Sequence, residues 1–163
     1  MSYFEGTDGN DVVDLSDQFY SLVEMFDGAD EILSSGGAAW IRSLLTNDTL
    51  GDTLTVSNGA EIDFADLRGS GNTVAVTGEG GGFRSFLRFL DGGPGSDDLR
   101  VSDRALVLTA DLDGGANDVE VTGTASFLAT LTTFDGNDTV RFVDGGAGET
   151  AYVGGGRNTV ALV

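Results

Sequence analysis

The chain contains no cysteine, no histidine and no lysine, and all eight of its basic residues are arginine. Without cysteine there are no disulfides, so the redox compartment cannot be inferred from the sequence. Without histidine and cysteine, the Ser-His-Asp and Cys-His arrangements of nucleophilic enzymes are excluded, and a zinc site would have to use carboxylates alone. These absences exclude several common enzyme classes.

The sequence also lacks the usual signals for membrane insertion and for N-terminal export. Residues Met1–Glu5 have neither the basic segment nor the apolar core of a secretory signal peptide. No apolar run approaches the length of about 20 residues that spans a membrane. We therefore expect no membrane insertion, and we expect any export to use a route that does not read an N-terminal signal.

Positive charge is scarce, because 27 acidic residues give the chain a net charge of −19. A surface this acidic repels phosphate backbones and anionic lipids, which predicts no nucleic-acid partner and favours cations. Twenty of the acids are aspartate, the acid that suits tight turns and calcium loops. At 163 residues with 40% hydrophobic residues, we expect one folded domain over 1–163.

Internal repetition organises the sequence. A glycine-rich turn, an Asp or Asn, and an alternating apolar run recur at residues 6–13, 27–32, 51–56, 69–76, 92–99, 115–119, 135–140 and 154–160. The Asp or Asn falls at positions 11, 30, 52, 72, 97, 117, 138 and 158, a period near 20. The one long interval contains residues 78–82, which we interpret as an inserted loop. Such a repeat is typical of solenoids.

Each period holds two apolar runs, which predicts two strands per coil. The second runs lie at residues 19–25, 40–45, 62–67, 83–90, 106–112, 127–131 and 152–153. In the first runs every second side chain must face inward. The spacing therefore predicts one interior column made of Val13, Ile32, Leu54, Val74, Leu99, Val119, Val140 and Val160.

These patterns predict an all-β fold, a right-handed parallel β-solenoid of about eight coils of about 20 residues. A unit of this size cannot bury its own apolar face, so the coils must stack, and eight of them would form a rod about 38 Å long. An antiparallel β-sandwich is the alternative. The repeated turns favour the solenoid, because a sandwich has no reason to repeat them.

Two segments carry a resemblance to a known family. Gly92–Arg100 matches every position of the nonapeptide Gly-Gly-x-Gly-x-Asp-x-apolar-x, and Gly6–Asp14 matches all but one. The chain thus resembles the RTX proteins, which fold as parallel β-rolls. The resemblance implies calcium held by turn carbonyls and Asp carboxylates of neighbouring coils. It also implies type I secretion and a secreted, extracellular or cell-surface protein; the apolar tail Asn158–Val163 is similar to what that route tolerates.

The chain departs from RTX proteins in having glycine-rich turns on only one edge, a longer coil, and Asn at positions 72, 117 and 158. Because an amide adds no charge, we expect the calcium sites to be interrupted along the edge. The predicted calcium ligands are Asp8, Asp11, Asp27, Asp30, Asp52, Asp97, Asp135 and Asp138. The alternative is a ladder of Asp and Asn side chains that bind turn backbone without metal.

Catalysis and flat-surface recognition are weaker interpretations. Some glycan-cleaving β-helices use Asp and Arg on an outer face, and here Arg88, Arg100, Arg104 and Arg141 are predicted to lie near Asp97, Asp98, Asp103 or Asp138. We favour surface ion pairs as the explanation of such neighbours, because carboxylates occur throughout the chain and no cluster stands apart. Ice binding needs a threonine array, yet the outward column reads Val12, Glu31, Thr53, Thr73, Asp98, Asp118, Thr139 and Thr159. We therefore expect no enzyme, and rank ice or glycan binding low.

Two functional hypotheses follow. The first is a structural protein that self-associates through its coil ends into a filament or surface layer, stabilised by calcium. The second is a calcium-binding RTX-like accessory module of a secreted enzyme or adhesin. Recognisable repeats extend from Gly6 to Val163, and an uncovered end coil presents unpaired backbone groups and an open apolar cross-section. End-to-end stacking of copies would satisfy both, which favours the structural hypothesis.

Overall fold

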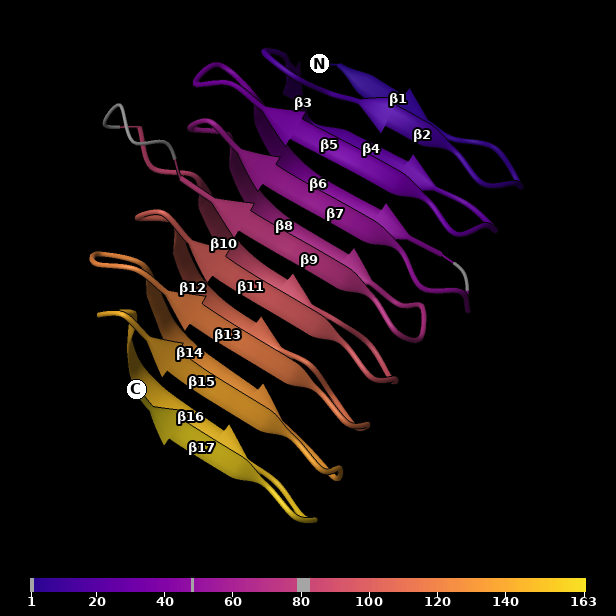
Figure 1. Ribbon diagram of the computed structural model, residues 1–163. Helices are drawn as coiled ribbons and strands as arrows, with labels where there is room; N and C mark the ends of the chain where they lie inside the picture. The colour runs from indigo at the N-terminus through magenta and orange to yellow at the C-terminus, as the bar shows by residue number, and fades with distance from the viewer. Residues whose placement is uncertain (1, 48, 79–82) are drawn as a thin grey trace.

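The computed structural model describes residues 2–47, 49–78 and 83–163, and these form a parallel β-solenoid (Figure 1). The chain winds through about seven turns of about 21 residues, with two strands per turn in two parallel sheets. The predicted fold class is confirmed. The expected eight coils are corrected to about seven, because eight copies of the turn bound seven intervals.

The first sheet contains nine strands among the described residues. Its order is β1 (Tyr3–Glu5), β4 (Leu22–Met25), β6 (Trp40–Thr46), β8 (Glu61–Leu67), β10 (Phe86–Asp91), β12 (Leu106–Asp111), β14 (Phe127–Thr133) and β16 (Ala147–Val153), with the short β3 (Phe19–Tyr20) beside β6. Strands β3 and β4 lie in one layer, since both pair with β6. The sheet therefore has eight layers.

The second sheet has eight strands in the described part of the chain. They are β2 (Val12–Asp14), β5 (Glu31–Ser35), β7 (Thr53–Ser57), β9 (Thr73–Thr77), β11 (Asp98–Ser102), β13 (Asp118–Thr122), β15 (Thr139–Val143) and β17 (Thr159–Leu162). Both sheets thus have the same number of layers. Figure 1 shows β1 and β2 at one end of the stack and β16 and β17 at the other.

The register of the eight-stranded sheet confirms the predicted interior column. Val13 pairs with Ile32, and the pairing continues coil by coil to Val140 and Val160. The inner members from Ile32 to Val140 are at most 2% exposed. The outward neighbours, from Val12 to Thr159, also form one column, as expected.

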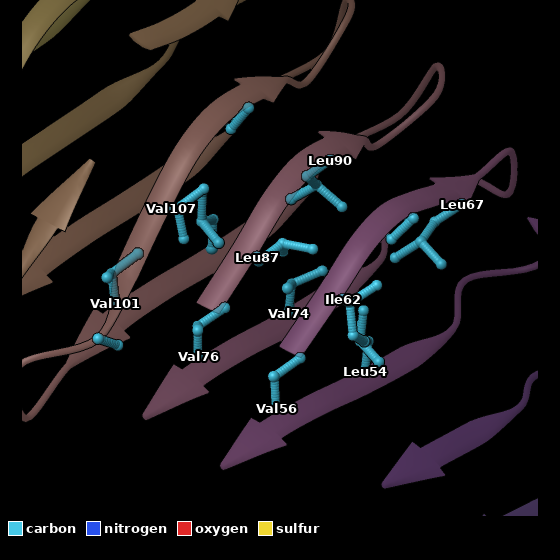
Figure 2. Packing of buried hydrophobic residues seen from close by; sticks show 14 of the residues in the cluster. Leu54, Val56, Ile62, Leu67, Val74, Val76, Leu87, Leu90, Val101 and Val107 are labelled. Atoms are coloured by element: carbon cyan, nitrogen blue, oxygen red, sulfur yellow. The ribbon is translucent and has the colours of Figure 1, made fainter. Parts of the chain in front are cut away.

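The core lies between the two sheets. Leu54, Val56 and their equivalents in later coils face Ile62, Leu67 and theirs, and these side chains fill the interior (Figure 2). In β6 the buried residues are Ile41, Leu44 and Thr46. Two consecutive outward residues therefore lie between Ile41 and Leu44. Strict alternation is broken there, and the same pattern recurs in β8 and β14.

The turns lie along two opposite edges of the stack (Figure 1). On the edge that carries the repeated Asp or Asn, successive coils approach so closely that a Cβ on Gly28 would lie 2.7 Å from the carbonyl carbon of Gly9. The other edge also uses glycine, since Gly36 and Gly59 have φ of +97° and +87°. The expectation of glycine-rich turns on one edge only was therefore wrong.

Two further points concern the sequence-based expectations. Strand β1 was not predicted, because it precedes the first recognisable turn. The expected inserted loop begins at Gly78, whose amide donates to Ser102 O, but its residues 79–82 lie outside the described residues. Within the described ranges, no helix long and apolar enough to cross a membrane occurs.

Candidate functional site

The repeated Asp and Asn residues form a continuous hydrogen-bonded line, here called the Asx ladder. In each coil the backbone N–H of this residue donates to the side-chain Oδ1 of the equivalent residue in the next coil, at 2.8–3.0 Å. The ladder comprises Asp11, Asp30, Asp52, Asn72, Asp97, Asn117, Asp138 and Asn158. The ladder proposed from the sequence as the alternative to calcium is thus present, although its presence does not test calcium binding.

The ladder is buried, although four of its six inner members are acids. Asp30, Asp52, Asp97 and Asp138 are at most 3% exposed. The ladder residues from Asp11 to Asp138 also accept a backbone bond through their carbonyls, as when Thr53 N–H donates to Asp30 O at 2.7 Å. Because Oδ1 accepts an amide in every coil after the first, Asp and Asn are interchangeable at this atom. They differ at the second side-chain atom.

At the Asn positions, the second atom is the amide nitrogen, and it donates to turn carbonyls. Asn72 Nδ2 donates to the carbonyls of Leu67, Gly69 and Gly92 at 2.6–3.2 Å. Asn117 Nδ2 likewise donates to Leu112 O at 3.1 Å. The place occupied by this atom is therefore lined by carbonyl oxygens, which accept hydrogen bonds and can also coordinate hard cations.

At two Asp positions, a threonine satisfies the second oxygen. Asp11 Oδ2 accepts the N–H of Thr7 at 2.7 Å and its hydroxyl at 3.1 Å. Asp138 Oδ2 accepts the hydroxyl of Thr133 at 2.9 Å. Both carboxylates therefore already have hydrogen-bond donors suited to the charged form.

Asp97 has no such donor. Its Oδ1 accepts the N–H of Asn72 at 2.8 Å, but its Oδ2 is buried and has no hydrogen-bond partner among the described residues. It lies close to Gly92, where an added Cβ would be 2.9 Å away. Burial, together with the nearby Asp113 and Asp91 carboxylates, raises the pKa of Asp97 from 3.8 to about 6, and the hydrogen bond from Asn72 opposes this rise. This oxygen needs a proton or a cation.

The predicted calcium ligands separate into two groups. Asp11, Asp30, Asp52, Asp97 and Asp138 lie in the ladder, whereas Asp8, Asp27 and Asp135 are exposed on the turns and take no part in it. Among the described residues, no three acidic side chains converge as metal ligands. A calcium ion would therefore rely on turn carbonyls, and the unpartnered oxygen of Asp97 makes that turn the best fit for the ion.

The predicted arginine neighbours are surface ion pairs. Arg100 pairs with Asp98 at 3.0 Å, as expected. Arg141 pairs with Asp118 and Glu120 of the preceding coil, at 3.0 and 3.3 Å, and not with Asp138. The donors and acceptors are half-exposed, so each pair contributes about 1 kcal/mol or less.

The outer face of the nine-stranded sheet carries aromatic side chains that the sequence analysis did not single out. Phe19 and Trp40 lie with ring centroids 5.0 Å apart, and Phe64 stacks on Phe89 at 5.3 Å. For Phe64 and Phe89 the missed signal is the pair of consecutive outward positions in β8 and β10, where each of them is the second residue of the pair.

The two ends of the stack expose strands with no partner strand among the described residues. At one end, Val12 of β2 is 80% exposed; at the other, Val160 and Leu162 of β17 are 54% and 83% exposed. Thr159 N–H donates to Asp138 O and Val163 N–H to Phe142 O. In a parallel strand alternate residues bond to opposite neighbours, so the N–H groups of Val160 and Leu162 point to the open side.

Comparisons with protein-family models, with curated proteins and with solved structures found no match to this chain. The resemblance to RTX proteins therefore depends on the turn motif and on the parallel solenoid alone.

Proposed function

We propose that this protein is a structural β-solenoid that associates end to end with further copies of itself into a filament or layer. The observation that carries the proposal is the pair of exposed end layers, where the terminal strands of both sheets have no partner strand within the part of the chain that the structure describes. An exposed parallel edge presents free N–H and C=O groups that another strand can satisfy. Apolar side chains such as Val160 would be buried by the same contact.

The two ends match each other in kind. Each end presents one strand of each sheet. The coils inside the molecule also pair through strands of both sheets. A heterologous contact of this type propagates into a filament unless a rotation closes it. Stacking a second copy would repeat an interface that the chain already forms many times within itself.

The net charge of −19 opposes this association. Copies in contact repel one another unless salt or bound cations reduce the charge. Calcium bound at the Asp97 turn would reduce the negative charge of each copy and so weaken the repulsion between copies. The RTX-like turn motif adds the proposal that the protein works outside the cell, after secretion by a type I route.

A second candidate function is a calcium-binding accessory module of a secreted enzyme or adhesin. The observation that favours it is the buried Asp97 Oδ2, which lies near turn backbone and has no hydrogen-bond donor. This candidate needs the ion and does not need assembly. Binding of calcium by a chain that stays monomeric would favour it over the structural proposal.

The structural proposal is tested by sizing the protein with light scattering over a range of concentrations, with calcium and with chelator. We expect large species that Val160→Pro combined with Ala161→Lys removes, because proline deletes an N–H on the open side only. The control is Val160→Ala with Ala161→Lys, which adds the same charge but keeps the N–H, and should lose less association. A wild-type chain that remains monomeric at high concentration in calcium would refute the proposal.

A further inference from the structure

We infer that the contact between copies is polar and has a single register, in which β17 of one copy pairs with β2 of the next and Arg157 lies against the acidic turn that holds Asp8 and Asp11. This inference rests on the proposed function and names the orientation and the specificity of its contact. Three independent features of the two ends lead to it.

The first feature is the Asx ladder, which has a direction. Each ladder N–H donates to Oδ1 of the following coil, so the N–H of Asn158 points out of the last coil. At the other end, Asp11 Oδ1 accepts the Thr7 hydroxyl at 3.1 Å, and no ladder N–H of residues 2–47, 49–78 or 83–163 donates to it. Stacking the last coil on the first gives Asn158 the acceptor that every other ladder residue has.

The ladder bond sets the register of the strands beside it. Thr159 N–H donates to Asp138 O, so in the same pattern Val12 N–H of the next copy donates to Asn158 O. Thr159 then lies opposite Val12, and Val160 lies opposite Val13, which extends the interior column from copy to copy. A shift by one residue would turn the apolar side chains of this edge outward.

The second feature is the size of the inward side chains in the nine-stranded sheet. One column reads Leu44, Ala65, Leu90, Ala110, Leu131 and Ala151, alternating large with small. Phe4 heads this column through its pairing with Val23, so the next copy places Phe4 over Ala151. Alternation of this kind fills space between layers. Two first coils face to face would instead set two Phe4 rings together, and two last coils would leave a void.

The third feature is charge. Arg157 is exposed, and within the described residues it forms no ion pair. It occupies the position just before the ladder residue, as Asn10 does in the first coil, and the N–H of Arg157 donates to Asn137 Oδ1 in that column. In the inferred register Arg157 therefore lies over Asn10, between Asp8 and Asp11. A basic turn at one end meets an acidic turn at the other.

The register is tested by charge reversal, measured as the association constant by sedimentation equilibrium. Arg157→Glu should weaken association about tenfold, because an attraction becomes a repulsion. The matched control is Arg104→Glu, which makes the same change in net charge at an exposed position of an inner coil, on the opposite edge. It should change the constant by less than about threefold.

Mixing tests the pairing of opposite charges across the contact. Asp8→Arg should weaken association of that variant with itself, as Arg157→Glu does. An equimolar mixture of the two variants should associate more strongly than either alone, since the substituted turn of each variant then meets a turn of opposite charge on the other. Far-ultraviolet circular dichroism must show that both retain β structure. If Arg157→Glu does not fold, Arg157→Gln should show a smaller loss in the same direction.

The possible outcomes separate the inference from the proposed function. Wild-type protein that never associates overturns both. Wild-type protein that associates, with equal losses in Arg157→Glu and Arg104→Glu, overturns the register and leaves end-to-end association standing. Association of Arg157→Glu as strong as that of wild type overturns the head-to-tail polarity, because in a tail-to-tail contact this change only replaces one pair of like charges by another. A mixture that associates no better than its components overturns the pairing of Arg157 with the acidic turn.

Discussion

Replacing Asp97 by asparagine should stabilise the protein at neutral pH, although it alters the residue that best matches the RTX motif. Asp97 is 3% exposed, and its Oδ2 has no hydrogen-bond partner in the described part of the chain. Asn72 at the equivalent position donates to three carbonyls. An amide at position 97 would place a donor where the carboxylate now places an acceptor. The substitution thus converts an unfavourable contact into a hydrogen bond.

The magnitude follows from the pKa of Asp97, which burial raises from 3.8 to about 6. The native state then holds the proton more tightly than the unfolded chain. Asp97 therefore supports folding fully below about pH 4, and this contribution is lost as the pH rises through about 6. Each tenfold change in proton affinity is worth about 1.4 kcal/mol, so the loss amounts to about 3 kcal/mol.

Urea unfolding, followed by circular dichroism at low protein concentration and without calcium, measures this effect. We expect Asp97→Asn to raise the free energy of unfolding by about 2–3 kcal/mol at pH 7.5 and to change it little at pH 4. The control is Asp135→Asn, an exposed turn residue, which removes the same charge and should show no such dependence. Equal stabilities of wild type and Asp97→Asn at both pH values would refute the reasoning.

Three further predictions concern the core, calcium and salt. Val119→Asp should lower the free energy of unfolding by more than about 4 kcal/mol in urea titrations, because it buries a charge in the middle of the interior column. The control Glu120→Asp, at an outward position, should lower it by less than about 1 kcal/mol. Similar losses in the two variants would contradict the interior column. Millimolar calcium should raise the melting temperature of wild type at pH 7.5, and at a hundredfold excess over Kd the stabilisation should be about 2.7 kcal/mol. Calcium should not raise the melting temperature of Asp97→Asn. Identical melting curves of wild type with calcium and with chelator would reject the calcium site. Raising the ionic strength from about 0.01 to 0.15 M should strengthen association measured by light scattering, because it shortens the screening length from about 30 to 8 Å. Weaker association in salt would show that repulsion between the negatively charged copies does not govern assembly.

The fold was predictable because two local patterns agree with one global arrangement. The period-2 alternation after each turn specifies which side chains face inward, and the near-constant turn spacing specifies which coils stack. Val119 could therefore be placed between Leu99 and Val140 from the sequence alone, as the register confirms. Strand β1 lacked a preceding turn motif, so neither pattern applied to it.

The chemistry of the turns was less predictable, because it depends on atoms that the repeat does not specify. Asp11, Asp97 and Asp138 look equivalent in the sequence, yet Thr7 and Thr133 satisfy two of them and leave the third unsatisfied. The partner of Arg141 was missed for a similar reason, since Asp118 lies 23 residues away and meets it only through coil stacking.

Electron cryo-microscopy of concentrated wild-type protein in calcium most directly tests the central claim of end-to-end assembly. With eight layers per copy and about 4.8 Å between layers, the account predicts rods in which copies repeat every 38 Å or so, with both sheets continuous through each junction. Isolated particles of that length at every concentration, or copies joined side by side through a sheet face, would contradict it.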